Sequence, residues 1–213
     1  LATGEILVPP GVQQWVEWPV NLVGVPDGYV RLELGPNPEV GWCASGTFLP
    51  GQVSMYRMGN HPRMRAIFHP LAFRVAPAQA VYGPENVVSG ETRPHRGVNL
   101  WRSDAGQPLP QWVELAWAKP QTIRHVELSF PGQLVAEVHA YPPFYRDPQC
   151  PRDYRIEGYR NGAWHTLIEA AGNYQRHRRH ALQAPVDVEK LRVVVLATNG
   201  DPSAAIYEVR CYA

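Results

Sequence analysis

Proline and glycine interrupt this sequence so often that long helices are hard to place. The 213 residues include 22 prolines and 18 glycines. Proline removes a hydrogen bond from a helix interior, and glycine costs backbone entropy there. The stretches between these breaks suit short extended segments, so the sequence predicts many short strands joined by turns.

Apolar and polar residues alternate within these stretches, which is the period of a half-buried strand. Residues 16–22 and 30–34 alternate on either side of Pro26-Asp27-Gly28, a sequence typical of a turn. Further strands are expected between residues 40 and 75. The segment 76–80 is small and featureless, and the pattern changes after it. We therefore expect an all-β chain of two tandem β-sandwich-type units, residues 1–78 and 79–213.

Two hairpins are expected in the second unit. One would turn at Lys119-Pro120, and the other at Asn161-Gly162, a strong tight-turn signal. Residues 191–196 form a nearly continuous apolar run, which predicts a strand covered on both faces. Alternation resumes in residues 207–212, so the unit is expected to end in a strand.

The charge balance excludes several classes of partner. Twenty basic and nineteen acidic side chains give a formal net charge of +1, so no overall field draws the chain to nucleic acid or to an anionic membrane. No apolar run approaches the roughly 20 residues that cross a bilayer. The start at Leu1 has neither a methionine nor a signal-peptide pattern, so we expect a processed or excised piece.

The three cysteines, Cys43, Cys150 and Cys211, are too few for a disulfide framework. Two interpretations stay open: buried free thiols, or a Cys150–Cys211 bridge if the protein is exported. The compartment is therefore left open, and an extracellular or periplasmic place is favoured only if the chain binds carbohydrate.

Five segments of the second half together resemble a discoidin (coagulation factor type C) domain. They are residues 86–94, 99–104, 111–115, 152–156 and 205–212. The resemblance implies an eight-stranded, galactose-binding-like jelly roll with loops gathered at one end, which family 32 carbohydrate-binding modules use to hold sugars.

More broadly, residues 29–213 resemble the C-terminal region of a group of bacterial FAD-dependent oxidoreductases, chiefly through residues 83–88 and 99–101. This resemblance implies a flavoenzyme domain on the same or another chain. No Gly-x-Gly-x-x-Gly follows a strand here, so no FAD is expected to bind this chain, and no cofactor is predicted.

The resemblance also raises a structural calcium ion. Many discoidin domains bind calcium through an Asp-Gly-Asn loop and a glutamate near the C-terminus. Here the loop reads Ser89-Gly90-Glu91, and Glu208 matches the glutamate. Calcium takes roughly six to eight oxygen ligands, and the loop has lost one aspartate. Glu208 is thus either a calcium ligand or a paired carboxylate that fixes the last strand.

No catalytic residue is predicted. The sequence has no Gly-x-Ser-x-Gly, no His-Glu-x-x-His and no phosphate-binding loop. Asp104 and Asp153 are acid/base candidates only if the fold brings them together. His177 and His180 have a metal-ligand spacing, but the arginines of residues 176–180 would repel a divalent metal and better suit an acidic glycan.

Loop tips rich in aromatic and polar side chains are the candidate ligand site. Sugars stack on aromatic rings while amides, guanidinium groups and carboxylates take their hydroxyls. The candidates are Arg93, His95, Asn99, Arg102, Asp104, Tyr141, Phe144, Tyr145, Arg146, Tyr174 and Arg178. The alternative is that the aromatic residues of 141–145 pack against another domain, and Trp101 is expected in the core.

The predicted function is therefore a non-catalytic, carbohydrate-binding accessory module, with an acidic glycan as one candidate ligand. The alternative is a structural tail of an FAD-dependent oxidoreductase that has no ligand of its own.

Overall fold

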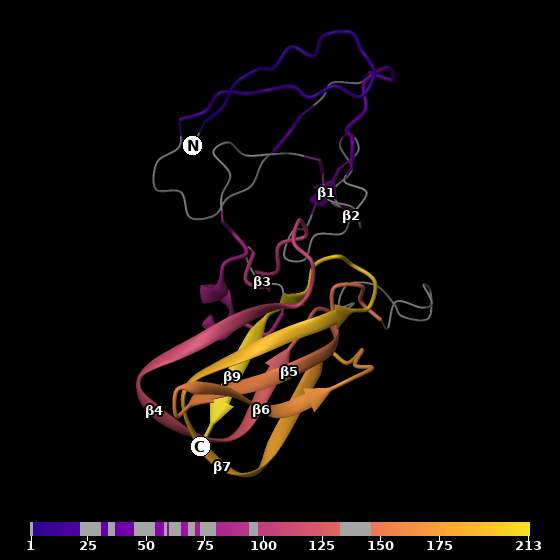
Figure 1. Cartoon of the computed structure of the whole chain (residues 1–213). Helices are drawn as coiled ribbons and strands as arrows, with labels where there is room; N and C mark the ends of the chain where they lie inside the picture. The colour runs from indigo at the N-terminus through magenta and orange to yellow at the C-terminus, as the bar shows by residue number, and fades with distance from the viewer. Residues whose placement is uncertain are drawn as a thin grey trace. The chain divides into compact units, whose positions relative to one another are not determined.

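The computed structural model describes residues 2–21, 31–33, 37–44, 54–57, 59, 65–67, 71–72, 80–93, 98–132 and 146–213. The chain separates into two compact units, residues 1–75 and 76–213, and each is described by itself. The elements are β1 (Ser54–Tyr56), β2 (Arg65–Ile67), the 3-10 helix η1 (Pro84–Val88), β3 (Trp101–Arg102), β4 (Gln111–Ser129), β5 (Pro151–Arg160), β6 (Ala163–Ala170), β7 (His177–Thr198), β8 (Ala205–Ile206) and β9 (Glu208–Tyr212), most of them labelled in Figure 1.

The first unit contains two short antiparallel pairings in its described part. Strands β1 and β2 pair, with Ser54 opposite Ile67. A single bridge joins Ala44 to Leu71, beside a hydrogen bond of 2.9 Å from the Ala72 N–H to the Cys43 carbonyl. These pairings agree with antiparallel strands between residues 40 and 75, but a second sandwich is not shown by them.

The alternating run near the start of the chain forms no strand in its described part, residues 16–21, so that prediction is wrong there. Trp18 and Val20 are 37% and 44% exposed, and Pro19 between them has no N–H to donate to a ladder. Alternation by itself supplies one face of a strand. A strand also needs a partner, and no described segment pairs with this one.

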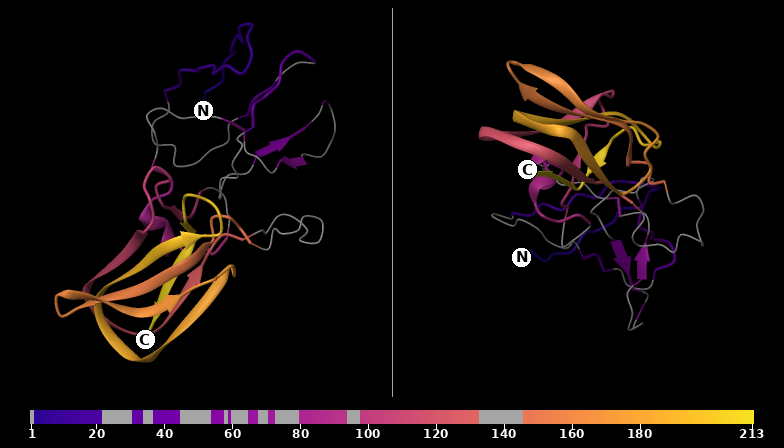
Figure 2. Two further views of the ribbon diagram at one scale, coloured as in Figure 1. Left: turned by 45° about the vertical axis from the view of Figure 1, so that its right-hand side comes forward. Right: turned by 90° about the horizontal axis from the view of Figure 1, so that it is seen from below.

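The second unit is built on a five-stranded antiparallel sheet in the order β6-β5-β7-β4-β9. Strand β5 pairs with residues 190–198 of β7, whereas β9 pairs with residues 125–129 of β4. The long strands β4 and β7 curve, so that one part of each lies beside β5 and the other part lies toward β9, as Figures 1 and 2 show. The sheet thus folds over on itself into two layers, and both layers contain parts of β4 and β7.

The predicted hairpin at Lys119-Pro120 is wrong. Residues 111–116 and 125–129 do not pair with each other, because both belong to β4 and both pair with β7. The register shifts between Ala116 and Gln121, where proline interrupts the ladder. Lys119-Pro120 therefore marks a bend at which one strand changes layer.

The second predicted hairpin is confirmed. Strands β5 and β6 pair antiparallel, with Arg160 opposite Ala163. Asn161 and Gly162 adopt φ values of 52° and 77°, the left-handed conformation that a two-residue type I′ turn needs. Nearby, a Cβ on Gly158 would lie 2.5 Å from Val188 Cγ1, so only glycine fits at this point of β5.

One hydrophobic core joins the two layers. It includes Val113, Ile156 and Val193 from one layer and Leu128 and Val209 from the other. Trp101 is 8% exposed and belongs to the same core, which confirms its predicted place. The all-β sandwich expected for the second half is thus present. Seven strands are found in its described ranges, 80–93, 98–132 and 146–213, two of which serve both layers.

The cysteines are all free, so the Cys150–Cys211 bridge is not formed. Cys150 is fully buried and Cys211 is partly buried, so the interpretation as buried free thiols fits these two cysteines. Cys43 is free but exposed. Burial raises the pKa of both the Cys150 and Cys211 thiols to about 12. In the described part of the chain, no helix has the length and hydropathy of a membrane span.

Candidate functional site

The loops at one end of the sandwich are held together by backbone hydrogen bonds. The N–H groups of Asn199, Asp201 and Ala205 donate to the carbonyls of Cys150, Pro148 and Gln149, respectively, at 3.1–3.2 Å. The Asn173 N–H donates to the Arg152 carbonyl at 2.8 Å, and the Ser103 N–H to the Ala204 carbonyl at 2.9 Å. Loops far apart in the sequence therefore form one ordered surface, which we call the loop end.

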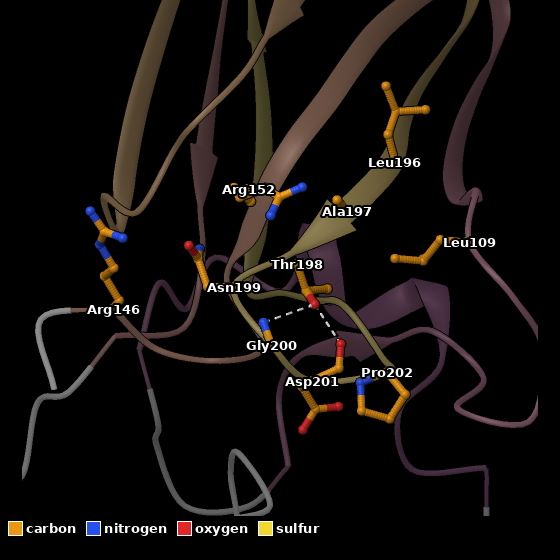
Figure 3. A pocket seen from close by; sticks show the side chains of 10 residues that line it. All are labelled: Leu109, Arg146, Arg152, Leu196, Ala197, Thr198, Asn199, Gly200, Asp201 and Pro202. Carbon is orange, nitrogen blue, oxygen red and sulfur yellow. Dashed lines mark hydrogen bonds between the residues drawn. The ribbon is translucent and has the colours of Figure 1, made fainter. Parts of the chain in front are cut away.

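A pocket of about 600 Å³ opens on the loop end. Its lining combines apolar, amide and charged groups from three stretches of the chain (Figure 3). The lining residues are Leu109, Arg146, Arg152, Leu196, Ala197, Thr198, Asn199, Gly200, Asp201 and Pro202. The pocket is wide open to solvent, and its lining offers a ligand both apolar contact and hydrogen-bonding groups.

Asp201 is the acidic group of the pocket lining, and its carboxylate is already engaged. Oδ1 accepts hydrogen bonds from Ser203 N at 2.9 Å, Ser203 Oγ at 3.0 Å and Arg102 Nη2 at 3.4 Å, while Oδ2 accepts one from Gln149 Nε2 at 3.1 Å. Burial alone would raise the pKa of Asp201, but these hydrogen bonds and the Arg102 charge together lower it below its usual value. Asp201 is therefore ionised and fixes the loop.

Arg152 and Arg146 supply the positive groups of the pocket. Arg152 donates from Nε and Nη2 to Asp153 Oδ2, at 2.9 and 2.8 Å, and its side chain is half exposed. The hydrogen bond from Arg152 lowers the pKa of Asp153, and a second one from the Gly172 N–H adds to this effect. The Arg146 guanidinium lies 5.6 Å from the centre of the Tyr174 ring.

Asn173 fixes the tip that carries Tyr174. Its Nδ2 donates to the Pro151 carbonyl at 2.8 Å, and its Oδ1 accepts from Gln175 N and Arg178 Nη1, both at 3.1 Å. Asn173 is 2% exposed, whereas Tyr174 is 44% exposed. A buried amide thus presents an exposed ring beside Arg146.

Asp147 lies next to this network in an unfavourable place for a charge. Burial raises the pKa of Asp147, the hydrogen bond from the Gln149 N–H lowers it, and the nearby charge of Asp201 raises it further. The net shift is upward, so Asp147 holds a proton more readily than a surface aspartate does.

The predicted site residues fall into several groups. Arg146 lines the pocket, Tyr174 contacts Arg146, and Arg102 supports the pocket through Asp201. Arg178 is turned to Asn173, as described above. His95, Tyr141, Phe144 and Tyr145 lie outside the described residues, so their predicted role is not addressed by this geometry.

The remaining predicted residues support their own loops. Asn99 Nδ2 donates to the Arg93 carbonyl at 2.8 Å, and the Arg93 side chain is exposed. Asp104 Oδ1 accepts from the Gly106 N–H at 2.8 Å, and Gln111 Nε2 donates to the Asp104 carbonyl at 2.7 Å. Asp104 and Asp153 have separate hydrogen-bond partners, since Asp153 accepts from Arg152 and from the Gly172 N–H.

Several pocket residues were missed by the sequence reasoning. Arg152, Asn199 and Asp201 stand out only once the loops are assembled, because each comes from a segment with an ordinary strand or turn pattern. Asn199-Gly200-Asp201-Pro202 was a usable signal, since these four turn-forming residues follow directly after a buried strand.

Glu208 makes the contacts of a paired carboxylate. Its Oε2 accepts a hydrogen bond from the Gly90 N–H at 3.0 Å, and its Oε1 accepts one from Arg210 Nε at 3.2 Å. The Arg210 Nη2 also donates to the Gly90 carbonyl at 3.1 Å. A guanidinium on one carboxylate oxygen and a backbone N–H on the other do not fit a calcium ligand set.

His177 and His180 lie on opposite faces of β7, because residues three apart on a strand do not share a face. His180 is 8% exposed and faces the core, whereas His177 is exposed. Within the described residues, no three histidine, cysteine, aspartate or glutamate side chains come together as a metal site.

The sequence matches no protein-family profile and no curated protein. Solved structures, however, share the fold of the second half. The family 32 carbohydrate-binding module of Streptococcus pneumoniae EndoD superposes with a TM-score of 0.51 at 20% identity, over 65% of this chain and 90% of its own. A module of a GH31 protein, CBM32-2, bound to GalNAc, gives 0.51 at 17% identity over 63% and 90%.

A third module, from Clostridium perfringens NanJ in complex with galactose, gives a TM-score of 0.50 at 14% identity over 63% of this chain and 88% of its own. The second half of this chain therefore has a fold similar to that of family 32 carbohydrate-binding modules. These likenesses bring no support for the flavoenzyme context that the sequence also suggested.

Proposed function

We propose that residues 76–213 form a non-catalytic carbohydrate-binding module, with the sugar held in the loop-end pocket. The observation that carries this proposal is the pocket lining, which combines the Arg146 and Arg152 guanidinium groups and Asn199 with the apolar side chains of Leu109 and Leu196. A sugar presents hydroxyls at its edge and C–H groups on its face, so it needs both kinds of wall. The similar modules in complex with galactose and GalNAc support the same assignment.

The mechanism is local concentration. A module that holds a sugar weakly keeps a tethered catalytic domain near its substrate. We propose binding without hydrolysis, because Asp201, the carboxylate of the pocket lining, is occupied by Arg102, Ser203 and Gln149. A carboxylate with its lone pairs taken is a poor acid, base or nucleophile.

Calorimetric titration of the full chain with galactose and N-acetylgalactosamine tests this proposal. Arg152→Gln should weaken binding about tenfold, since it removes a hydrogen-bond donor to the ligand. Asn199→Ala should weaken it at least as much, since Asn199 Nδ2 also fixes the loop end through the Cys150 and Asn173 carbonyls, both at 3.0 Å. Arg124→Ala serves as the matched control, because Arg124 is exposed in β4 outside the pocket lining and should leave affinity unchanged. Equal losses in all three variants, or no binding of any sugar, would contradict the proposal.

The two arginines of the pocket lining favour a sugar that carries a negative charge, because a guanidinium group matches a carboxylate or sulfate. Asp201 adds little repulsion, since its charge is compensated by Arg102. The acidic glycan predicted from the sequence is therefore the more specific form of the proposal. Galacturonate should bind more tightly than galactose, and added salt should reduce the difference.

The alternative, a structural tail of an FAD-dependent oxidoreductase, stays a prediction. If the chain is such a tail, calorimetric titration with any neutral or acidic sugar should show no heat of binding. The same titration therefore separates the two functions.

A further inference from the structure

The outer face of the sheet beside the pocket carries an unusual concentration of aromatic and charged side chains. Val113, Ile156 and Val193 point to the core, so their strand neighbours Trp112 and Arg192 lie on the opposite face. The residues of this face form a group that we call the outer-face cluster. Its members are Trp112, Glu114, Arg155, Glu157, Tyr159, Trp164, Lys190 and Arg192. They come from β4, β5, β6 and β7.

One guanidinium group joins two tryptophans across this face. The Cζ atom of Arg192 lies 4.2 Å from the centre of the Trp164 ring and 5.5 Å from that of Trp112. The Tyr159 ring meets Trp164 edge to face at 5.2 Å. Trp112 remains 52% exposed. The result is a band of rings joined by the Arg192 guanidinium across the strands, in which the half-exposed Trp112 ring is the part open to a ligand.

The charged members of the outer-face cluster pair with one another, three cations with two carboxylates. Glu157 is 5% exposed and takes Arg192 Nη2 at 2.7 Å and Arg155 Nε at 3.3 Å as ion-pair partners. Lys190 Nζ lies 3.0 Å from Glu114 Oε1. The face therefore has fixed hydrogen-bonding groups with little net charge, which gives phosphates or anionic lipids little attraction.

The outer-face cluster and the loop-end pocket are linked through β7. Val194 lies opposite Trp112 in the pairing with β4, and Leu196, two residues further along β7 and at the register shift between β5 and β7, lines the pocket. Arg192 and Leu196 are four residues apart, and four residues of a strand span about 13 Å. A ligand that leaves the pocket along β7 meets Trp112 and Arg192.

We propose that this face is an extended subsite of the pocket, which takes the neutral oligosaccharide chain that follows the sugar in the pocket. The inference rests on the proposed carbohydrate-binding function and extends it from single sugars to chains. A flat sugar face fits the exposed Trp112 ring, and hydroxyls fit the fixed carboxylate and guanidinium edges around it. A partner protein fits less well, because it would have to desolvate the ion pairs at the centre of the face.

The experiment compares sugar ladders on the full chain by calorimetry: galactose against β-1,4-galactopentaose, and N-acetylglucosamine against chitopentaose. The wild type should bind at least one pentasaccharide about five- to tenfold more tightly than its monosaccharide, which is the factor that one aromatic stacking contact is worth. Trp112→Ala should keep the monosaccharide affinity and lose this gain, and Trp112→Phe should keep most of it. Trp15→Ala, which removes an exposed tryptophan of the first unit, should leave both affinities unchanged.

The outcomes separate the two claims. Monosaccharide binding without a gain from chain length, or a gain that Trp112→Ala preserves, overturns the extended subsite and leaves the pocket intact. No binding of any sugar overturns both. A concentration-dependent dimer in sedimentation that Trp112→Ala abolishes, with no dependence of affinity on chain length, makes the face a protein interface and overturns the subsite.

Discussion

At the scale of single residues, a predicted ligand group can turn out to support the site. Arg102 was expected at a loop tip, yet its Nε donates to Ser203 Oγ at 2.6 Å and its Nη2 pairs with Asp201 at 3.4 Å. Its guanidinium also lies 5.9 Å from the centre of the Tyr82 ring. A side chain held on three sides has little freedom to contact a ligand, so its main contribution is to the order of the pocket.

Arg102→Ala should therefore lower the free energy of unfolding by about 2 kcal/mol, because it leaves the Asp201 carboxylate without its cation in a mostly buried place. Urea unfolding followed by tryptophan fluorescence measures the change. Arg93→Ala removes an exposed arginine of a neighbouring loop and should shift stability by less than about 0.5 kcal/mol. Similar losses in both variants would refute the supporting role of Arg102.

At the scale of elements, the sandwich depends on contacts between its two layers. Tyr154 of β5 and His180 in the first part of β7 are both buried, and the Tyr154 Oη lies 2.8 Å from His180 Nε2. Phe130 packs edge to face against Tyr154 at 5.3 Å between ring centres. This aromatic group closes the sandwich near the point where the first part of β7 meets the end of β4.

The His180 contact makes stability depend on pH. Burial lowers the pKa of His180, and the nearby Arg178 charge lowers it further. The folded state therefore prefers neutral imidazole, while the unfolded chain takes up a proton below about pH 6.5. Stability should be fully present above that value and be lost as the pH falls towards the folded pKa.

Urea midpoints measured between about pH 7.5 and pH 5 test this dependence. His180→Gln keeps a hydrogen-bonding partner for Tyr154 but cannot titrate, so its midpoint should fall less with acidification. Asp147 opposes the histidine effect in both proteins, because its raised pKa favours proton uptake by the folded state. Parallel slopes in the two proteins would show that His180 does not set the pH dependence.

At the scale of the whole molecule, the described contacts separate residues 1–75 from residues 76–213. The hydrophobic core described above lies entirely within the second unit. A unit with its own core and a closed set of strand pairings is expected to fold alone.

Residues 76–213 expressed alone should show a single cooperative urea transition, with the midpoint of the same transition in the full chain. Circular dichroism and tryptophan fluorescence should report it together. A fragment without a cooperative transition would show that residues 1–75 are required for the fold of the second unit.

Sequence patterns specified what depends on neighbouring residues. Asn161-Gly162 fixed a turn because few residues adopt positive φ, and the alternation in β5 and β9 fixed which side chains face the core. Trp101 followed from the discoidin-like pattern around it. The bend at Lys119-Pro120 was predicted as a hairpin turn. A proline at the end of a hairpin strand and a proline that interrupts one long strand look the same in the local sequence, and here the strand continues.

The sequence by itself determined that the second half of this chain forms a β-sandwich with polar and aromatic loops, because alternation and turn residues act over a few positions. Only the tertiary structure decided which loops form a pocket and which faces adjoin it. Arg152 and Asn199 are 47 residues apart and meet only because β5 and β7 pair antiparallel, with Pro151 opposite Thr198. Strand pairing between distant segments sets the site, and no local pattern records it.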